Sequence, residues 1–471
     1  MNLWILTEER PKKDVVGKII EKFVEEKGIA CFFDTIRILP VLNNKGDFTF
    51  TYEVIGVNSA IVKKIYLKIV SGKSSFVDFL IFYQNDKPTA SDTPIFAIEE
   101  TKTDDAESRN TGVFQRATKF VYIEVFYPNI DKTMLYNLQI EQKKSATQTN
   151  IFGSRCFRTL GVKLSGKISD PQHDVPWASI NELIDYKKAM RKPPAGNVPI
   201  DIKIVGSKIT VSGRLIKSDA LGHDPNIGAL SLIAATLRAL GWVGAIEITR
   251  HGLSAKHLLR SNKFILVANK LNITLEGLVL PNPPMPDHYW HYETNSEKLG
   301  TIFLHVVVEN FTKGMSIYEN HAGCERGYFI TNTGAYLSID KKIPEAHVLP
   351  GMERRNIEIP DLVLIDLDRV EIINIEGKTF ANVDIGIAEL NNFDAVEKYY
   401  IKKYYPDYKV IRTVVLYGGD SEAIAKIEVS FLLNRFGKLV LSFNAPELFK
   451  EAIKNLSSYW AHPERVPPTT S

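Results

Sequence analysis

Residues 94 to 107 join an apolar run to a dense group of charges, and this combination restricts how the chain can fold. The segment PIFAIEETKTDDAE begins like a buried strand, then places these charged residues within nine positions: Glu99, Glu100, Lys102, Asp104, Asp105 and Glu107. Repulsion among the acids and the cost of removing them from water disfavour a purely structural role unless a cation lies among them. The segment therefore indicates a cation site beside a core strand.

Length and composition indicate a multidomain protein, and its mixture of helical and strand-like patterns predicts an α/β fold. The chain has 471 residues, of which 44% are hydrophobic and 24% charged, well away from the composition of disordered chains. Proline-rich passages at 169–199 and 280–290 predict three parts, 1–168, 169–290 and 291–471. The middle part is expected to be a smaller α+β domain, with a hairpin in DIKIVGSKITVSGRLI and a buried helix in NIGALSLIAATLRALGW.

Charge and cysteine usage add limits on the function. No uncharged apolar run approaches a membrane span, and the N-terminus lacks the features of a signal peptide, so we expect a cytoplasmic protein without a membrane partner. The formal charge of +3 is too small to indicate a nucleic-acid partner by itself. Cys31, Cys156 and Cys324 are isolated in the sequence, which predicts neither a disulfide framework nor a paired-cysteine zinc site.

The first candidate site combines Asp78 with the strand that ends at EETK. Asp78 lies in SSFVDFLIFYQ, which has the composition of a strand, and a polar loop then leads into PIFAIEETK. Residues two apart on a strand share a face, so Glu100 and Lys102 are expected to project together, beside Asp78 if the two strands pair. The expected cluster is one Asp, one Glu and one Lys.

The same arrangement recurs near the C-terminus. IEIPDLVLIDLD and RVEIINIEGK predict a strand, a tight turn and a second strand, with Asp361 directly after Pro360. Glu376 and Lys378 again lie two apart on one face of the second strand. Each cluster is followed by a helical pattern, ESRNTGVFQRATKFVYIEVFY in the first case and LNNFDAVEKYYIKKYYP in the second. The chain therefore carries two similar candidate sites.

Such a set of side chains suits hydrolysis of a phosphodiester. Two carboxylates can hold Mg²⁺ while leaving coordination positions for water and a phosphate oxygen. The ion lowers the pKa of the water and offsets the negative charge that builds up on the phosphate. The lysine adds a positive group that orients the water or stabilises that charge.

Asp78 with EETK, and Pro360-Asp361 with EGK, resemble the PD-(D/E)XK nuclease superfamily, and the whole chain resembles a type II restriction endonuclease with two catalytic domains. The resemblance implies mixed β-sheets flanked by helices, in two nuclease-like domains separated by the middle domain. It also implies Mg²⁺-dependent cleavage of double-stranded DNA, with Asp78, Glu100, Asp361 and Glu376 as metal ligands and Lys102 and Lys378 near the attacking water. Val77, where the pattern has proline, is a departure.

Two segments are candidates for DNA contacts. Arg can bridge guanine O6 and N7, and Asn or Gln can bridge adenine N6 and N7. The segment after the first cluster supplies Arg109, Asn110, Gln115, Arg116 and Lys119. ITRHGLSAKHLLRSNKF in the middle part supplies Arg250, Lys256, His257 and Arg260. A solvated helical face is the alternative interpretation of the first segment.

We therefore expect a site-specific DNA endonuclease in which each of two active sites hydrolyses one strand. The active form is a monomer whose two nuclease domains act as a pseudo-dimer, or a homodimer. The alternatives are a DNA-binding protein with non-catalytic nuclease-like domains and a structure-specific nicking enzyme. The three-residue pattern Glu-x-Lys is common on solvated surfaces, so the prediction depends on each Asp, Glu and Lys converging in the fold.

Overall fold

The computed structural model describes residues 1–463 except for the segments 73–75, 102–111, 137–147, 167–170, 191–199, 214–224, 256–257, 259–261, 284–287, 322–326, 340–342, 344, 352–355 and 420–423. The chain forms two compact units: unit 1 (Met1–Ser71, Gln84–Asp86 and Tyr292–Ser471) and unit 2 (Gly72–Tyr83 and Lys87–His291). Of the predicted boundaries, residue 290 lies beside the end of unit 2, whereas residue 168 falls inside it.

Mixed sheets flanked by helices confirm the α/β class. Among the described residues, every helix is too short or too polar to cross a membrane.

Unit 1 contains two groups of strands. The first is ordered β2-β3-β4-β1 and comprises β1 (Asn2–Thr7), β2 (Cys31–Leu42), β3 (Phe48–Ser59) and β4 (Ile65–Gly72), with helix α1 (Lys13–Glu26). The second is a six-stranded sheet ordered β14-β17-β18-β19-β20-β21. Its strands are β14 (Met315–Glu319), β17 (Leu362–Asp366), β18 (Glu371–Thr379), β19 (Lys409–Tyr417), β20 (Val429–Leu433) and β21 (Leu439–Leu441). The predicted strand–turn–strand around residue 366 is confirmed.

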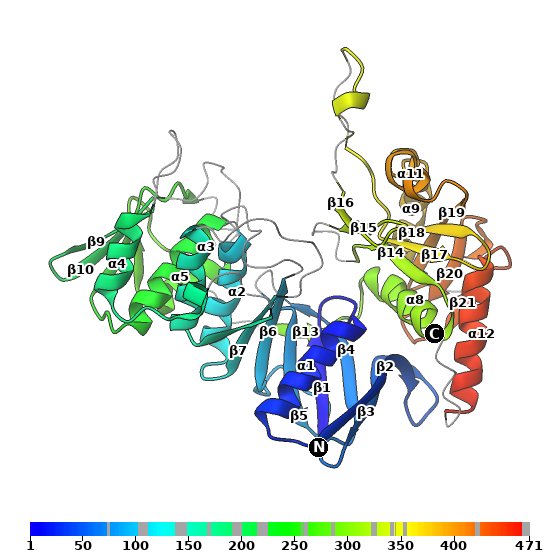
Figure 1. The fold of residues 1–471 in the computed structure, drawn as a ribbon, viewed down its shortest axis with the longest axis horizontal. Coiled ribbons are helices and arrows are strands. Elements are labelled where there is room, and N and C mark those ends of the chain that lie inside the picture. Colours follow the sequence, from blue (N-terminus) through cyan, green and yellow to red (C-terminus); the bar gives the residue numbers. More distant parts are fainter. Residues whose placement is uncertain are drawn as a thin grey trace. The chain divides into compact units, whose positions relative to one another are not determined.

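Helices cover both faces of the six-stranded sheet. They are α8 (Lys298–Phe311), η3 (Phe380–Asn382), α9 (Val383–Leu390), α10 (Asp394–Val396), the π-helical turn η4 (Glu397–Ile401), α11 (Lys402–Tyr404) and α12 (Glu447–Ala461). A hairpin of β15 (Tyr328–Ile330) and β16 (Tyr336–Ser338) and the short helix η2 (Glu345–His347) complete this part. Figure 1 shows the red helix α12 beside α8, against which it packs.

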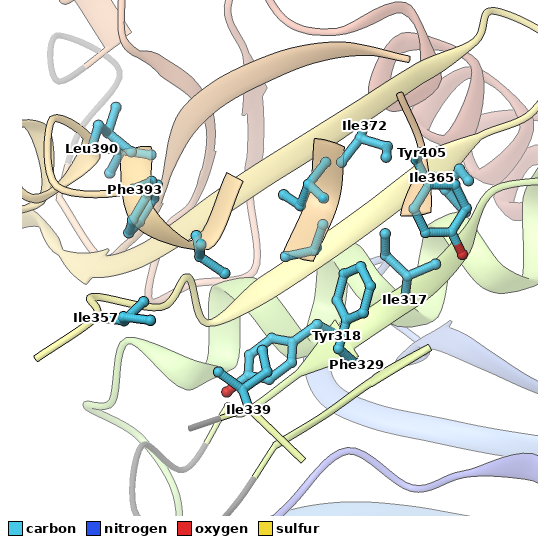
Figure 2. Packing of buried hydrophobic residues seen from close by; sticks show 14 of the residues in the cluster. Ile317, Tyr318, Phe329, Ile339, Ile357, Ile365, Ile372, Leu390, Phe393 and Tyr405 are labelled. Atoms are coloured by element: carbon cyan, nitrogen blue, oxygen red, sulfur yellow. The ribbon is translucent and has the colours of Figure 1, made fainter. Parts of the chain in front are cut away.

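Successive side chains of β19 point to opposite faces of the six-stranded sheet. Val414 and Leu416 belong to a buried cluster that also takes in Ile365 of β17 and Leu390 of α9; Figure 2 labels the last two. Val415 lies between them on the other face, where α8 approaches it at Gly300. The sheet is therefore buried on both sides, with α9 to α11 on one face and α8 on the other.

Unit 2 contains a sheet ordered β5-β6-β7-β8 and a four-stranded sheet ordered β12-β11-β10-β9. The first comprises β5 (Phe79–Gln84), β6 (Phe96–Thr101), β7 (Asp131–Tyr136) and β8 (Val162–Gly166), with α2 (Gly112–Phe126) and α3 (Gln148–Thr159). The second comprises β9 (Asp201–Val205), β10 (Lys208–Ser212), β11 (Ala245–Thr249) and β12 (Ile273–Leu275), with η1 (Pro171–Asp174), α4 (Ile180–Ala189), α5 (Pro225–Ala239) and α7 (Asn262–Lys270). β13 (Trp290–Tyr292) contains the sequence boundary between the units.

The middle of the chain folds locally as its sequence predicts. β9 and β10 form the expected antiparallel hairpin. The expected apolar helix is α5, and it is followed by Gly241 with φ of 89°, a left-handed conformation in which glycine is favoured after a helix. α5 packs against α2 and α3, so this middle segment belongs to the same compact unit as the first candidate site.

The two units repeat one strand order. In unit 2, β5 pairs antiparallel with β6, which pairs parallel with β7, which pairs parallel with β8. In unit 1, β17, β18, β19 and β20 have the same sequence of pairings. In each unit the antiparallel pair is followed by a helical crossover, α2 in unit 2 and α9 to α11 in unit 1. The similarity between the first and last parts of the chain therefore extends to strand topology.

Close approach of α8 to β18 depends on Gly377. A methyl group placed on this residue would lie 2.5 Å from Thr301 Cγ2 and 3.1 Å from Asp361 Oδ2. Both distances are shorter than ordinary van der Waals contact, so a larger residue would displace the helix or the Asp361 carboxylate. Gly377 therefore lets α8 pack against β18 at the position where the Asp361 carboxylate also lies.

We predict that Gly377→Ala lowers the free energy of unfolding by about 1–3 kcal/mol, because the added methyl group overpacks the contact with Thr301. Denaturant unfolding of the full chain measures this. Thr301→Ser removes the opposing methyl group, so the double variant should recover most of the lost stability. A Gly377→Ala protein as stable as the parent would show that this glycine does not set the spacing.

Candidate functional site

In unit 1 the antiparallel pairing of β17 and β18 brings Asp361 beside Glu376. Leu362 is paired with Ile375, so one further step places Asp361 opposite Glu376. The Asp361 carboxylate accepts a hydrogen bond from the backbone N–H of Gly377, with Oδ2 2.9 Å from the nitrogen. The predicted convergence of Asp361, Glu376 and Lys378 is therefore present, and the backbone of the second strand holds the aspartate.

Lys378 lies among carboxylates. Its ammonium group pairs with Glu376 and also with Glu389 of α9, at 2.8 Å from Oε2. Gly386, one turn before Glu389, leaves room for the lysine stem, because a methyl group there would lie 2.6 Å from Lys378 Cγ. Burial acts to lower the pKa of Lys378, but hydrogen bonds to Glu376 and Glu389 raise it overall. Glu389 is a member of the site that the sequence analysis missed.

The acids of this cluster hold protons more tightly than usual. Burial raises the pKa of Asp361 to about 7, and the charges of Glu297 and Glu389 add to the increase, against the opposing effects of Gly377 N–H and Lys378. Burial, followed by repulsion from Asp361, raises the pKa of Glu376 to about 8. The carboxylates of Asp361, Glu376 and Glu389 therefore outnumber the one ammonium group of Lys378. A divalent cation bound among them would stabilise their charged forms.

The first cluster, in unit 2, has the same backbone arrangement. Phe79 is paired with Ile98, so the continued register places Asp78 opposite Glu99. Asp78 Oδ2 accepts a hydrogen bond of 2.7 Å from the backbone N–H of Glu100, as Asp361 does from Gly377. The backbone N–H of Asp78 donates to Glu99 Oε2 at 3.2 Å. Asp78 and Glu99 therefore correspond to Asp361 and Glu376.

This register corrects the predicted partner of Asp78. The Glu-x-Lys spacing had assigned Glu100, but its neighbour Glu99 has its carboxylate beside Asp78, and alternation points Glu100 to the other face of β6. Thr101 occupies the position that corresponds to Lys378, and Lys102 lies outside the described residues. The shared dipeptide Ile-Glu, at 98–99 and 375–376, is the sequence signal that identifies the right glutamate.

Helix α2 supplies the positive charge in unit 2. Lys119 Nζ lies 2.7 Å from Glu99 Oε1 and 3.3 Å from Asp78 Oδ1, and Arg116 Nε lies 3.7 Å from Glu99 Oε1. Burial of Glu99, which is 2% exposed, and the charge of Asp78 raise its pKa to about 8 in spite of these cations. Arg116 and Lys119, predicted to contact DNA, thus contact the acids in this structure.

Most of the other residues predicted to contact DNA are not among the described residues. Arg109, Asn110, Lys256, His257, Arg260 and the side chain of Gln115 lie outside the described residues. Arg250 is exposed, has φ of 53°, and donates its backbone N–H to Glu276 Oε2 at 3.2 Å. The assignment of these residues to DNA stays a prediction.

Comparisons with protein-family models, with curated proteins and with solved structures found no match to this chain. The two clusters are therefore interpreted from their geometry.

We predict that Asp361→Asn stabilises the metal-free protein by about 1–2 kcal/mol at a pH above 8, because it removes a buried charge that is repelled by Glu376 and Glu389. The amide oxygen still accepts from Gly377 N–H. Asp368→Asn is the control, since this exposed residue pairs with Lys313 at 3.6 Å in water and should change stability little. Destabilisation by Asp361→Asn in thermal unfolding would contradict the crowding of charge.

Proposed function

We propose that this chain is a Mg²⁺-dependent endonuclease that cleaves double-stranded DNA at a specific sequence, as a type II restriction enzyme of the PD-(D/E)XK kind does. One observation carries the proposal: the same strand pairings, with an Asp opposite a Glu and held by the next backbone N–H, occur in both units. A buried glutamate paired with a partly buried aspartate has little structural value, and its repetition at matched positions favours a shared chemical role.

The donor set at each site fits Mg²⁺. Asp361 and Glu376, and likewise Asp78 and Glu99, offer hard carboxylate oxygens and leave positions for water and phosphate oxygens. Bound Mg²⁺ would make the attacking water more acidic and offset charge on the phosphate. Lys378 in unit 1 would orient that water by hydrogen bonding and would stabilise the negative charge that develops as the oxygen–phosphorus bond forms and the bond to the leaving 3′ oxygen breaks. The attacking water would release its proton to solvent, and the leaving oxygen would take a proton from solvent.

Lys119 is proposed for the same part in unit 2. It contacts both acids of the first site, as Lys378 contacts Glu376 and Glu389. The ammonium group would then come from the crossover helix in one unit and from the strand in the other. A lysine can serve from either element because its charge, carried on a flexible stem, needs proximity more than a fixed direction.

A second candidate function has support from the first site. Lys119 and Arg116 both lie within ion-pair distance of Glu99, and these cations compete with a metal ion for its carboxylate. If they prevent metal binding in unit 2, only the site in unit 1 is catalytically active. It would then nick DNA, or cut both strands as a homodimer.

Cleavage of a plasmid of mixed sequence in the presence of Mg²⁺ tests the proposal, and discrete fragments are the expected result. Glu376→Gln and Glu99→Gln should each leave an enzyme that nicks, with double-strand cutting slowed at least about a hundredfold, because each removes one metal ligand. Glu100→Gln is the matched control for Glu99→Gln and should cut both strands. DNA binding without any cleavage would favour the non-catalytic alternative.

The source of the ammonium group in unit 2 is tested separately. We expect Lys119→Ala to reduce cleavage to nicking because it removes the cation beside Asp78 and Glu99, and we expect Lys102→Ala to keep double-strand cutting. Strand-specific labelling should show that Lys119→Ala and Lys378→Ala nick opposite strands. Nicking by Lys102→Ala together with full cutting by Lys119→Ala would assign the role to Lys102.

A further inference from the structure

Unit 1 has a second group of potential ligands, on the face of the sheet that α8 covers. His305 lies in α8, Glu319 ends β14, and His321 follows two residues later. Their potential ligand atoms all lie within 4.8 Å of one another, and His305 is buried while the other two are partly buried. His305 Nδ1 is 3.1 Å from His321 Nε2 and 3.5 Å from Glu319 Oε2. Two imidazoles and a carboxylate therefore converge on one point.

The two separations from His305 Nδ1 match a tetrahedral metal site. With Zn–N bonds of about 2.0–2.1 Å, neighbouring ligand atoms of a tetrahedral Zn²⁺ ion lie roughly 3.3 Å apart. The two distances from His305 Nδ1, 3.1 and 3.5 Å, lie on either side of that value. We propose that His305, Glu319 and His321 bind a divalent transition-metal ion of the Zn²⁺ class, with one coordination position left for water. The proposal is independent of DNA cleavage.

Thr301 orients one of the imidazoles. The Thr301 hydroxyl donates to the Lys298 carbonyl oxygen at 3.2 Å, so its oxygen accepts from His321 Nδ1–H at 2.9 Å. The lone pair of His321 Nε2 then faces His305. Hydrogen bonds of this kind, behind a ligating histidine, select the tautomer that binds metal. Thr301 is thus a positioning residue for the site.

His305 binds an ion through Nδ1 only after a change of tautomer. Without an ion, its Nδ1–H donates to His321 Nε2, and among the described residues its buried Nε2 has no hydrogen-bond partner. Binding moves the proton to Nε2 and replaces the hydrogen bond to His321 with bonds from both rings to the ion, which must exceed the cost of the lost hydrogen bond and of a buried N–H. A metal ligand must be a neutral imidazole, and the burial of these rings disfavours the charged imidazolium.

Two cations compete with a metal ion for Glu319. Arg10 Nε lies 2.8 Å from Oε2 and Lys12 Nζ lies 2.7 Å from Oε1. Arg10 also pairs with Glu309 at 2.8 Å and is almost fully buried, so its charge stays balanced. Lys12, which is 20% exposed, can move into water when an ion binds. Glu319 therefore either pairs with both Arg10 and Lys12 or binds the ion. The change from the first state to the second requires Lys12 to leave Glu319.

The test uses the full chain, stripped with a chelator and titrated with Co²⁺ and Zn²⁺. We expect one Co²⁺ per chain with the strong visible absorption of a low-symmetry site, displaced by Zn²⁺ and distinct from the weak absorption of Co²⁺ bound by carboxylates and water. Asp361→Asn should bind equally well, which separates this site from the acidic cluster. Thr301→Val should weaken binding about tenfold or more because it removes the bond that orients His321, whereas Thr301→Ser should keep it.

Two further variants complete the test. Lys12→Gln should tighten binding, because it removes a cation that competes with the ion for Glu319. His321→Asn should abolish binding in a chain whose circular dichroism shows that it is folded. Failure of the folded parent chain to take up either ion would overturn the proposal, as would uptake that neither Thr301→Val nor Lys12→Gln changes.

Discussion

Antiparallel pairing of two strands, one of them preceded by an aspartate, is the constraint from which both candidate sites follow. The register places that aspartate opposite a glutamate, and the backbone N–H after the glutamate binds the aspartate carboxylate. A backbone donor inside a sheet has a fixed direction, so it holds the aspartate carboxylate in position. In unit 1 it does so even though burial and repulsion act against the charge of Asp361. The crossover helix then covers the pair and adds its own charged residues, Glu389 in unit 1 and Lys119 in unit 2.

The two sites balance charge in different ways. In unit 1 the lysine belongs to the same strand as Glu376, and a third acid on α9 shares it. In unit 2 both cations come from α2, and Thr101 stands where the lysine would be. Because one arrangement leaves acids in excess and the other surrounds Glu99 with cations, the sites are expected to differ in metal affinity although their backbones match.

The six-stranded sheet separates two kinds of ligand. Alternation along β18 sends Glu376 and Lys378 toward α9, while the residue between them, Gly377, meets Thr301 of α8. The same threonine orients His321 on the α8 face. Oxygen donors suited to Mg²⁺ thus lie on one face, and a His-Glu set suited to a softer ion lies on the other. Thr301 and Gly377 connect them, so packing at this contact bears on both.

Local sequence determined much of the fold: an apolar run in the middle part predicted α5, and the apolar runs around Asp361 and Glu376 predicted a strand pair and its acidic cluster. Only the tertiary structure decided which of two adjacent glutamates faces Asp78, because a shift of one residue turns every side chain of a strand to the other face, and strand register depends on a partner distant in the sequence. The sequence analysis missed Glu389, the His305 group and the pairing of Lys119 with the acids for the same reason. Each joins its site across helix–sheet or strand contacts that no local pattern encodes.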